Sequence, residues 1–167
     1  MSLHGYTWPR SALPHRGYKV TKNSPMLVYP SDGSGSASVS YVYLVIERVD
    51  GDPEKTQQHP NHVSLVKAMG KICSAGSDSV PRLELSSIVL SCKITEVLRD
   101  QMPIDISRSL YLSDSTTCIL QCNSRTALYN SWVLPRLRFI KNTIDVEQDL
   151  MKLPSEQNSS DLGSKML

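Results

Sequence analysis

The sequence has no apolar run long enough to cross a membrane. Its longest apolar run extends from Tyr41 to Ile46, whereas a membrane-spanning helix needs about 20 apolar residues. The opening stretch MSLHGYTWPRSALPHRG also lacks the continuous apolar segment of a secretory signal. We therefore expect an intracellular protein, cytoplasmic or nuclear, with no membrane-bound part.

Cysteines with the spacing of a metal site are missing as well. None of the four cysteines belongs to a Cys-x-x-Cys pair, and no histidine stands at zinc-site spacing from one. Cys118 and Cys122 are four residues apart and would share a helix face, where a small thiol is usually a core residue. The pattern excludes zinc and thiol chemistry, and we expect reduced cysteines. They are Cys73, Cys92, Cys118 and Cys122.

A large excess of charge of one sign is also absent. The chain has 18 Lys and Arg against 16 Asp and Glu, and its formal net charge is +2. This value is too small to indicate a polyanionic partner by itself. Many nucleic-acid enzymes nevertheless carry local basic strips on a nearly neutral body, although any such residue taken alone is more often a solvated surface charge. The candidates are Arg82, Lys93, Arg99, Arg136, Arg138 and Lys141.

The length of 167 residues fits one domain. Residues 1–25 contain three prolines and no sustained hydrophobic period, so we predict a lead-in segment before a domain over 26–167. Strands are predicted at 26–29 and 39–49, and the first one ends in a serine- and glycine-rich turn. Residues 62–75 favour a further strand and leave a helix open.

The second half of the sequence alternates helix and strand patterns. We predict a long helix over 82–102 between Pro81 and Pro103, then a strand over 106–114 and a helix over 115–122, capped by Ser115, Thr116 or Thr117. A helix over 132–146 with Pro135 in its first turn and a short strand over 150–153 follow. This order predicts an α/β or α+β domain with a mixed sheet.

Three acidic residues fall where a predicted element begins or ends. Asp32 follows the first strand in a loop, Glu84 starts the long helix, and Asp114 ends a later strand. Strand ends of an α/β sheet face a common crevice, and carboxylates there suit a pair of Mg²⁺ ions about 4 Å apart. Simpler readings remain open: Asp32 as a turn residue, Glu84 as an acid favoured by the helix dipole, and Asp114 as an N-cap.

Several motifs resemble the ribonuclease H domain of BEL/Pao retrotransposon polyproteins. Residues 81–85 read PRLEL and residues 112–116 read LSDST, which are similar to the family's PRLEL and TDST signatures. The SDGS stretch at 31–34 looks like its DAS-x-x-A segment, VKA at 66–68 looks like its lysine strand, and the region of Trp132 looks like its tryptophan helix. Residues 153–165 resemble its closing VPSEDNPAD motif, which makes Asp161 the fourth acid.

The resemblance implies a ribonuclease H-like α/β fold, a five-stranded mixed sheet with helices on both faces and its first three strands antiparallel. It implies hydrolysis of the RNA strand of an RNA/DNA hybrid with two Mg²⁺ ions, or Mn²⁺, beside the reverse transcriptase domain of a parent polyprotein. Asp32 would bridge the metals, Glu84 and Asp114 would complete one side, and Asp161 would hold the other ion near the attacking water. The Ser115 hydroxyl and backbone groups near Glu84 would contact 2′-hydroxyls of the RNA.

Some positions depart from the family pattern. Gly33 replaces its alanine, Ser38 and Val39 replace its Tyr-Gly pair, and residues 158–161 read Asn-Ser-Ser-Asp where the family has Asn-Pro-Ala-Asp. A gained glycine and a lost proline predict looser loops at two ligand positions, and a loose site would cut slowly. The chain would be a fragment of a decayed element or a gene derived from one.

The alternative function is a catalytically silent nucleic-acid-binding or interaction module that keeps the ribonuclease H fold. The four intact acids favour the nuclease, because clustered carboxylates without a metal repel one another.

Overall fold

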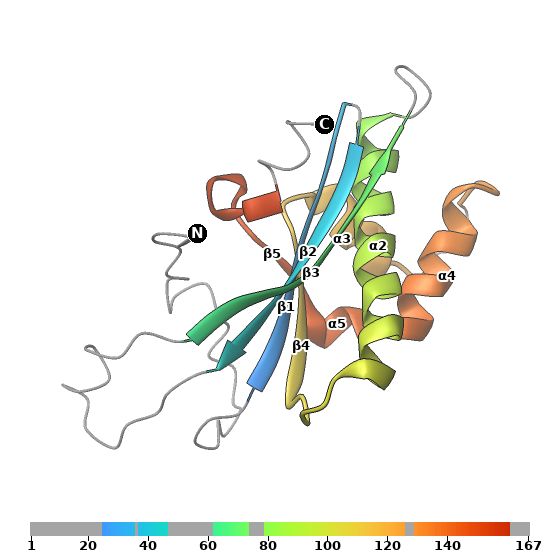
Figure 1. Cartoon of the computed structure of the whole chain (residues 1–167). Helices are drawn as coiled ribbons and strands as arrows, with labels where there is room; N and C mark the ends of the chain where they lie inside the picture. The colour runs from blue at the N-terminus through green and yellow to red at the C-terminus, as the bar shows by residue number, and fades with distance from the viewer. Residues whose placement is uncertain (1–24, 36, 47–61, 74–78, 126–128, 161–167) are drawn as a thin grey trace.

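The computed structural model describes residues 25–35, 37–46, 62–73, 79–125 and 129–160 (Figure 1). The predicted lead-in segment lies outside these residues except for Pro25. Among the described helices, none has the length and apolar character needed to span a bilayer.

Five strands form one mixed sheet in the order β3-β2-β1-β4-β5. β1 (Pro25–Ser34), β2 (Ala37–Ile46) and β3 (His62–Ile72) are antiparallel neighbours, which confirms the strand reading of the third segment. β4 (Arg108–Ser113) pairs with β1 in parallel, and β5 (Leu150–Lys152) pairs with β4 in parallel. The predicted mixed sheet is confirmed, and β1 is its central strand.

β1 is longer than the sequence predicts. The turn-rich composition after Tyr29 predicted the end of the strand there, but pairing with β2 continues to the Ser34–Ala37 pair. Proline has no N–H to donate, and the described β1–β2 register has no pair at residues 29 and 30, whereas Pro30 does pair with Leu112 of β4. The two neighbouring strands therefore hold a serine-rich segment extended, which its local composition does not indicate.

Three helices follow the predicted pattern. α2 (Val80–Gln101) begins two residues before its predicted start, because Pro81 fits a first turn whose N–H groups have no helical partner. α3 (Thr116–Asn123) is capped by Ser115, one of the three candidates, whose side chain accepts a hydrogen bond from the Cys118 N–H. α4 (Val133–Thr143) has Pro135 in its first turn, as predicted.

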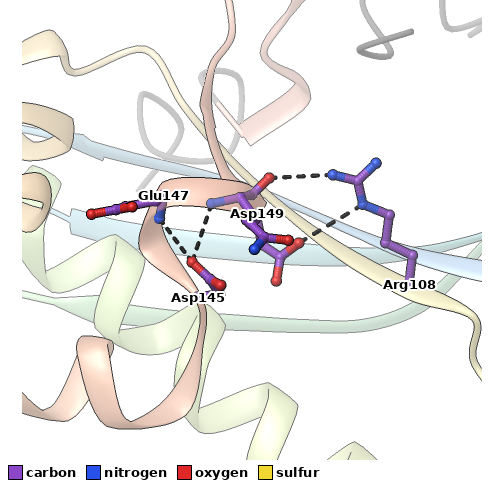
Figure 2. A network of polar contacts seen from close by, with 5 residues as sticks. Arg108, Asp145, Glu147 and Asp149 are labelled. Carbon is purple, nitrogen blue, oxygen red and sulfur yellow. Dashed lines mark hydrogen bonds and ion pairs between the residues drawn. The ribbon is translucent and has the colours of Figure 1, made fainter. Parts of the chain in front are cut away.

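The fourth helix was not predicted. α4 ends three residues before its predicted end because Ile144 is extended (φ −133°, ψ 155°), and α5 (Val146–Asp149) starts separately. The Asp145 carboxylate caps α5 by accepting two backbone N–H groups of its first turn. Figure 2 shows this turn beside Arg108, whose Nε lies 3.8 Å from the Asp149 carboxylate. These polar contacts attach α5 to β4.

The main core lies between the sheet and the helices. α2 packs on β1 and β2, and α4 packs on α2, as Figure 1 shows. Tyr29, Ile88, Cys118 and Ile140 are among the buried residues of this cluster, to which α2, α3 and α4 all contribute. A smaller cluster that includes Val28 lies apart from it. Cys118 and Cys122 are buried in the main core, as predicted, and Cys92 is buried there as well.

Candidate carboxylate site

Two of the predicted acids lie next to each other at one end of the sheet. The parallel pairing of β1 and β4 matches Ser31 with Ser113, and Asp32 and Asp114 are the next residues of the two segments. Neighbouring strands are about 4.8 Å apart, so the two acids are close. Asp32 lies in β1 and is 6% exposed, so its predicted place in a loop is wrong. Asp114 directly follows β4, and Ser115 rather than Asp114 caps α3.

Glu84 reaches this end of the sheet because α2 begins directly against β1. A Cβ on Gly33 would overlap the backbone of Leu83 and Glu84 and would lie 2.5 Å from the Leu83 carbonyl oxygen. The Ser38 hydroxyl donates to that carbonyl oxygen at 2.8 Å, which ties the start of α2 to β2. Gly33 is buried in a strand and permits a close approach of strand and helix, so the interpretation that it loosens a loop is wrong.

The Glu84 carboxylate has a fixed hydrogen-bond partner. Its Oε2 accepts from the Ser115 hydroxyl at 2.7 Å, and the same hydroxyl oxygen accepts from the Cys118 N–H at 3.3 Å. A hydroxyl has one proton to donate to a hydrogen bond, and here it donates that proton to the bond with the carboxylate. In this arrangement Ser115 orients Glu84, and a contact of Ser115 with a 2′-hydroxyl of the RNA stays a prediction.

The charges of Asp32 and Asp114 act on Glu84. Burial raises the pKa of the Glu84 carboxyl, the Ser115 hydrogen bond opposes that rise, and the negative charges of Asp114 and Asp32 add to it. Glu84 stands beyond the first turn of α2, so the simpler reading of a first-turn acid does not apply. Negative charge is therefore unfavourable here, and a bound cation would relieve it.

The C-terminal segment attaches to the same end of the sheet. The Ser155 hydroxyl, in the short helix η2 (Ser155–Gln157), donates to Asp114 Oδ2 at 2.9 Å. Asn158 Nδ2 donates to the Ser31 carbonyl oxygen at 3.1 Å, and the Ser160 hydroxyl donates to the Pro30 carbonyl oxygen at 2.8 Å.

Asn158 and Ser160 are 3% and 0% exposed, and they precede Asp161, which lies outside the described residues. Ser160 makes a hydrogen bond to β1 that the family's alanine could not make, and the loosening expected from the lost proline stays a prediction.

The donor types suit a metal, but the described residues by themselves do not form a complete ligand shell. Within the described ranges, no three His, Cys, Asp or Glu side chains are grouped so that they could hold a metal ion. Carboxylates on adjoining elements with mutually repelling charges are the hard oxygen donors that Mg²⁺ prefers. The chemistry of Asp32, Glu84 and Asp114 thus fits a divalent cation.

Sequence reasoning missed the small polar residues that position these acids. Ser38, Ser155, Asn158 and Ser160 all bond to the backbone or to an acid at this end of the sheet. Serine and asparagine are mostly surface residues, so nothing in their types indicates burial. The one available signal was the closing motif itself, which places Asn158 and Ser160 just before an acid.

Comparison with solved structures identifies the fold. The N-terminal RNase H domain of Rv2228c from Mycobacterium tuberculosis, solved as a fusion with maltose-binding protein, is similar with a TM-score of 0.50 at 11% identity, covering 86% of this chain and 96% of that one. RNase H1 from the archaeon Halobacterium salinarum NRC-1 is similar with a TM-score of 0.46 at 11% identity, covering 81% of this chain and 89% of that one. Prototype foamy virus protease–reverse transcriptase is similar with a TM-score of 0.48 at 8% identity, covering 91% of this chain and 21% of that one.

Comparison of the sequence identifies the family. Among curated proteins, no sequence matches the chain significantly. The family described as "Pao retrotransposon-like RNaseH-like domain" matches residues 2–115, which include Asp32, Glu84 and Asp114. The match spans well over half of the chain, and the five-stranded mixed sheet is that of ribonuclease H folds. The chain therefore belongs to the Pao retrotransposon-like RNaseH-like domain family and is a domain of the ribonuclease H type.

Proposed function

We propose that this chain is a metal-dependent endonuclease that hydrolyses the RNA strand of RNA/DNA hybrids. Asp32, Glu84, Asp114 and Asp161 would hold two Mg²⁺ ions, which Mn²⁺ could replace. The main support is the convergence of the first three acids, from three separate elements, at one end of the sheet with their charges coupled at Glu84. We further propose that the domain acts inside the cell and, by the family resemblance, beside the reverse transcriptase domain of a parent polyprotein.

The chain's own residues fix the acids before substrate binds. Asp32 is held within the central strand, Ser115 orients Glu84, and Ser155 orients Asp114. A carboxylate that a neighbouring side chain already holds by a hydrogen bond loses little freedom when it binds a metal ion, which favours binding in a productive geometry. Ions bound there would polarise the scissile phosphate and lower the pKa of the attacking water.

Cleavage of a labelled RNA/DNA hybrid tests the proposal. We expect the purified chain to cut only the RNA strand when Mg²⁺ or Mn²⁺ is present. It should not cut duplex DNA, and it should not cut the hybrid when a chelator is added. Asp114→Asn should lower the rate roughly a hundredfold or more at nearly constant volume, because removing even a group that only supports a metal ligand costs about 10- to 100-fold. Asp105→Asn, an exposed acid on the segment before β4, is the matched control and should keep full activity.

Two results would contradict the proposal. Equal cutting by Asp114→Asn and the parent chain would exclude the site. A folded chain that cuts no hybrid with either metal would instead indicate the catalytically silent binding module.

A further inference from the structure

A pocket lies at the end of the sheet opposite the carboxylate site. Its volume is about 430 Å³, and it is lined by the C-terminal half of α2, the N-terminal parts of β1 and β4, and the junction of α4 and α5. Asp32, Glu84 and Asp114 lie toward the other ends of β1, α2 and β4, and none of them lines it. Small-molecule sites are typically about 300–1,000 Å³, so this distal pocket has the size of a ligand site.

The base of the distal pocket holds a buried hydroxyl without a partner. Tyr29 and Tyr111 stack there with their ring centroids 4.6 Å apart. Thr95 Oγ1 donates to the Ser91 carbonyl oxygen at 3.0 Å, so the proton in its 2.8 Å contact with the Tyr111 hydroxyl comes from Tyr111. The Tyr29 hydroxyl is fully buried and has no hydrogen-bond partner in the described part of the chain. An unpaired buried hydroxyl is unfavourable, and an acceptor supplied by a ligand would remove that cost.

A cation at the mouth of the distal pocket has no counter-charge. Arg99 is exposed, its Nη2 contacts the Thr143 carbonyl oxygen at 3.5 Å, and it forms no ion pair within the described ranges. Burial raises the pKa of the Tyr29 hydroxyl, and two neighbouring hydroxyls and the positive charge of Arg99 oppose the rise, although neither neighbour completes a hydrogen bond with it. The charge of Arg99 therefore acts on the unpaired hydroxyl, and the two groups together suit a negatively charged acceptor.

The other charged groups around the distal pocket are engaged or face solvent. Figure 2 shows Arg108 beside Asp149, with 3.8 Å between Arg108 Nε and the carboxylate, and Asp145 caps α5. Asp105 is exposed at the rim. These carboxylates would repel a ligand with several negative charges, whereas a single carboxylate matches the single unpaired guanidinium.

The remaining lining of the distal pocket is mainly apolar. Leu98 and Ile144 are buried, and Met102 and Ile106 are partly buried. Apolar walls bind hydrocarbon groups because both surfaces leave water on contact. The pocket thus places apolar walls next to one cation and one free hydroxyl.

We propose that the distal pocket binds a small apolar monocarboxylate. The carboxylate lies between the Arg99 guanidinium and the Tyr29 hydroxyl, and the planar fork of a guanidinium matches its two oxygens. The hydrocarbon part packs against Leu98, Met102 and Ile144. This site is separate from the carboxylate site, so its ligand is independent of the proposed nuclease activity.

Titration of the full chain with three matched probes, without metal or nucleic acid, tests this inference. Phenylpropanoate, phenylpropanamide and phenylpropylamine have the same ring and chain, and at neutral pH their head groups are negative, neutral and positive. Ligand-observed NMR gives the dissociation constant of each probe. We expect the acid to bind at least about tenfold more tightly than the amide, because its hydrogen bonds are charge-assisted, and the amine to bind most weakly.

Two variants assign the binding to these groups. Arg99→Gln should lower the affinity for the acid to that for the amide, and Tyr29→Phe should lower it about tenfold. Tyr29→Phe should also keep or raise the thermal unfolding midpoint, since the hydroxyl that it removes has no partner. Arg138 is an exposed arginine of α4 that does not line the pocket, so Arg138→Gln is the matched control and should bind all three probes as the parent chain does.

Equal affinity for the acid and the amide, or tighter binding of the amine, would overturn the assignment. A folded parent chain that binds none of the probes would do the same. A lower unfolding midpoint in Tyr29→Phe would show that the hydroxyl has a partner in the fold, and an equal loss of affinity in Arg138→Gln would show that net charge rather than Arg99 attracts the acid; either result also refutes the site.

Discussion

Replacing Gly33 by alanine tests whether the approach of β1 and α2 builds the site. The added Cβ would overlap the backbone of Leu83 and Glu84, and backbone atoms cannot rotate away as a side chain can. Inserting one carbon into a packed interior costs about 1–3 kcal/mol, and this contact belongs at the upper end of that range. If α2 moves outward, the 2.8 Å hydrogen bond from Ser38 to Leu83 also lengthens, which loses about 1 kcal/mol more.

Gly35→Ala is the matched control for this change. A Cβ at Gly35 would meet no atom within 4 Å, and the φ angles of both glycines lie outside the left-handed region. The two variants therefore differ in the space around the new carbon and not in backbone strain. We expect Gly35→Ala to stay within about 0.5 kcal/mol of the parent chain.

Urea unfolding and thermal unfolding measure the difference between the two alanine variants. We expect Gly33→Ala to lower the free energy of unfolding by about 4 kcal/mol, or the Tm by roughly 8–16 °C for a domain of this size. Hybrid cleavage should fall as well, because Asp32 and Glu84 move apart. If both variants unfold with the same free energy, α2 shifts without cost and Gly33 does not set the site.

Three further predictions concern other groups. Ser115→Ala should cost about 1 kcal/mol of stability, since it removes the cap of α3, and should also reduce cleavage, whereas Ser115→Thr should keep both hydroxyl contacts. Normal cleavage by Ser115→Ala would exclude Ser115 as the residue that orients Glu84. Asn158→Ala and Ser160→Ala should each lower stability by about 1–2 kcal/mol and raise the Mg²⁺ concentration needed for half-maximal cleavage. If that Mg²⁺ concentration is unchanged, these residues only stabilise the fold. Burial raises the pKa of the Cys92 and Cys122 thiols to about 12 and that of the Cys118 thiol to about 11. At pH 8 a thiol reagent should therefore label Cys73 in the native chain and all four cysteines in urea. Rapid labelling of a second cysteine in the native chain would contradict the packed core.

The sequence by itself predicted the features that depend on near neighbours. The apolar spacing and flanking prolines predicted α2, the β-branched and aromatic residues predicted β2, and Ser115 was among the predicted caps of α3. Each of these depends on side chains a few residues apart, where hydrophobic period and capping chemistry can be read directly. Asp32, Glu84 and Asp114 were selected from their places at the ends of elements and from the family resemblance. The family match confirms the resemblance, and the role of the three acids stays a prediction.

Only the tertiary structure decided how the acids are positioned. Asp32 lies in a strand rather than a loop because β2 pairs with it through Val39 and β4 pairs with the residues directly before it. The start of α2 is fixed by Ser38, 45 residues away from Leu83, and the C-terminal segment is fixed by Asn158, 127 residues away from Ser31. Contacts between distant residues follow from how the elements pack, and a buried serine has the same letter in the sequence as a solvated one.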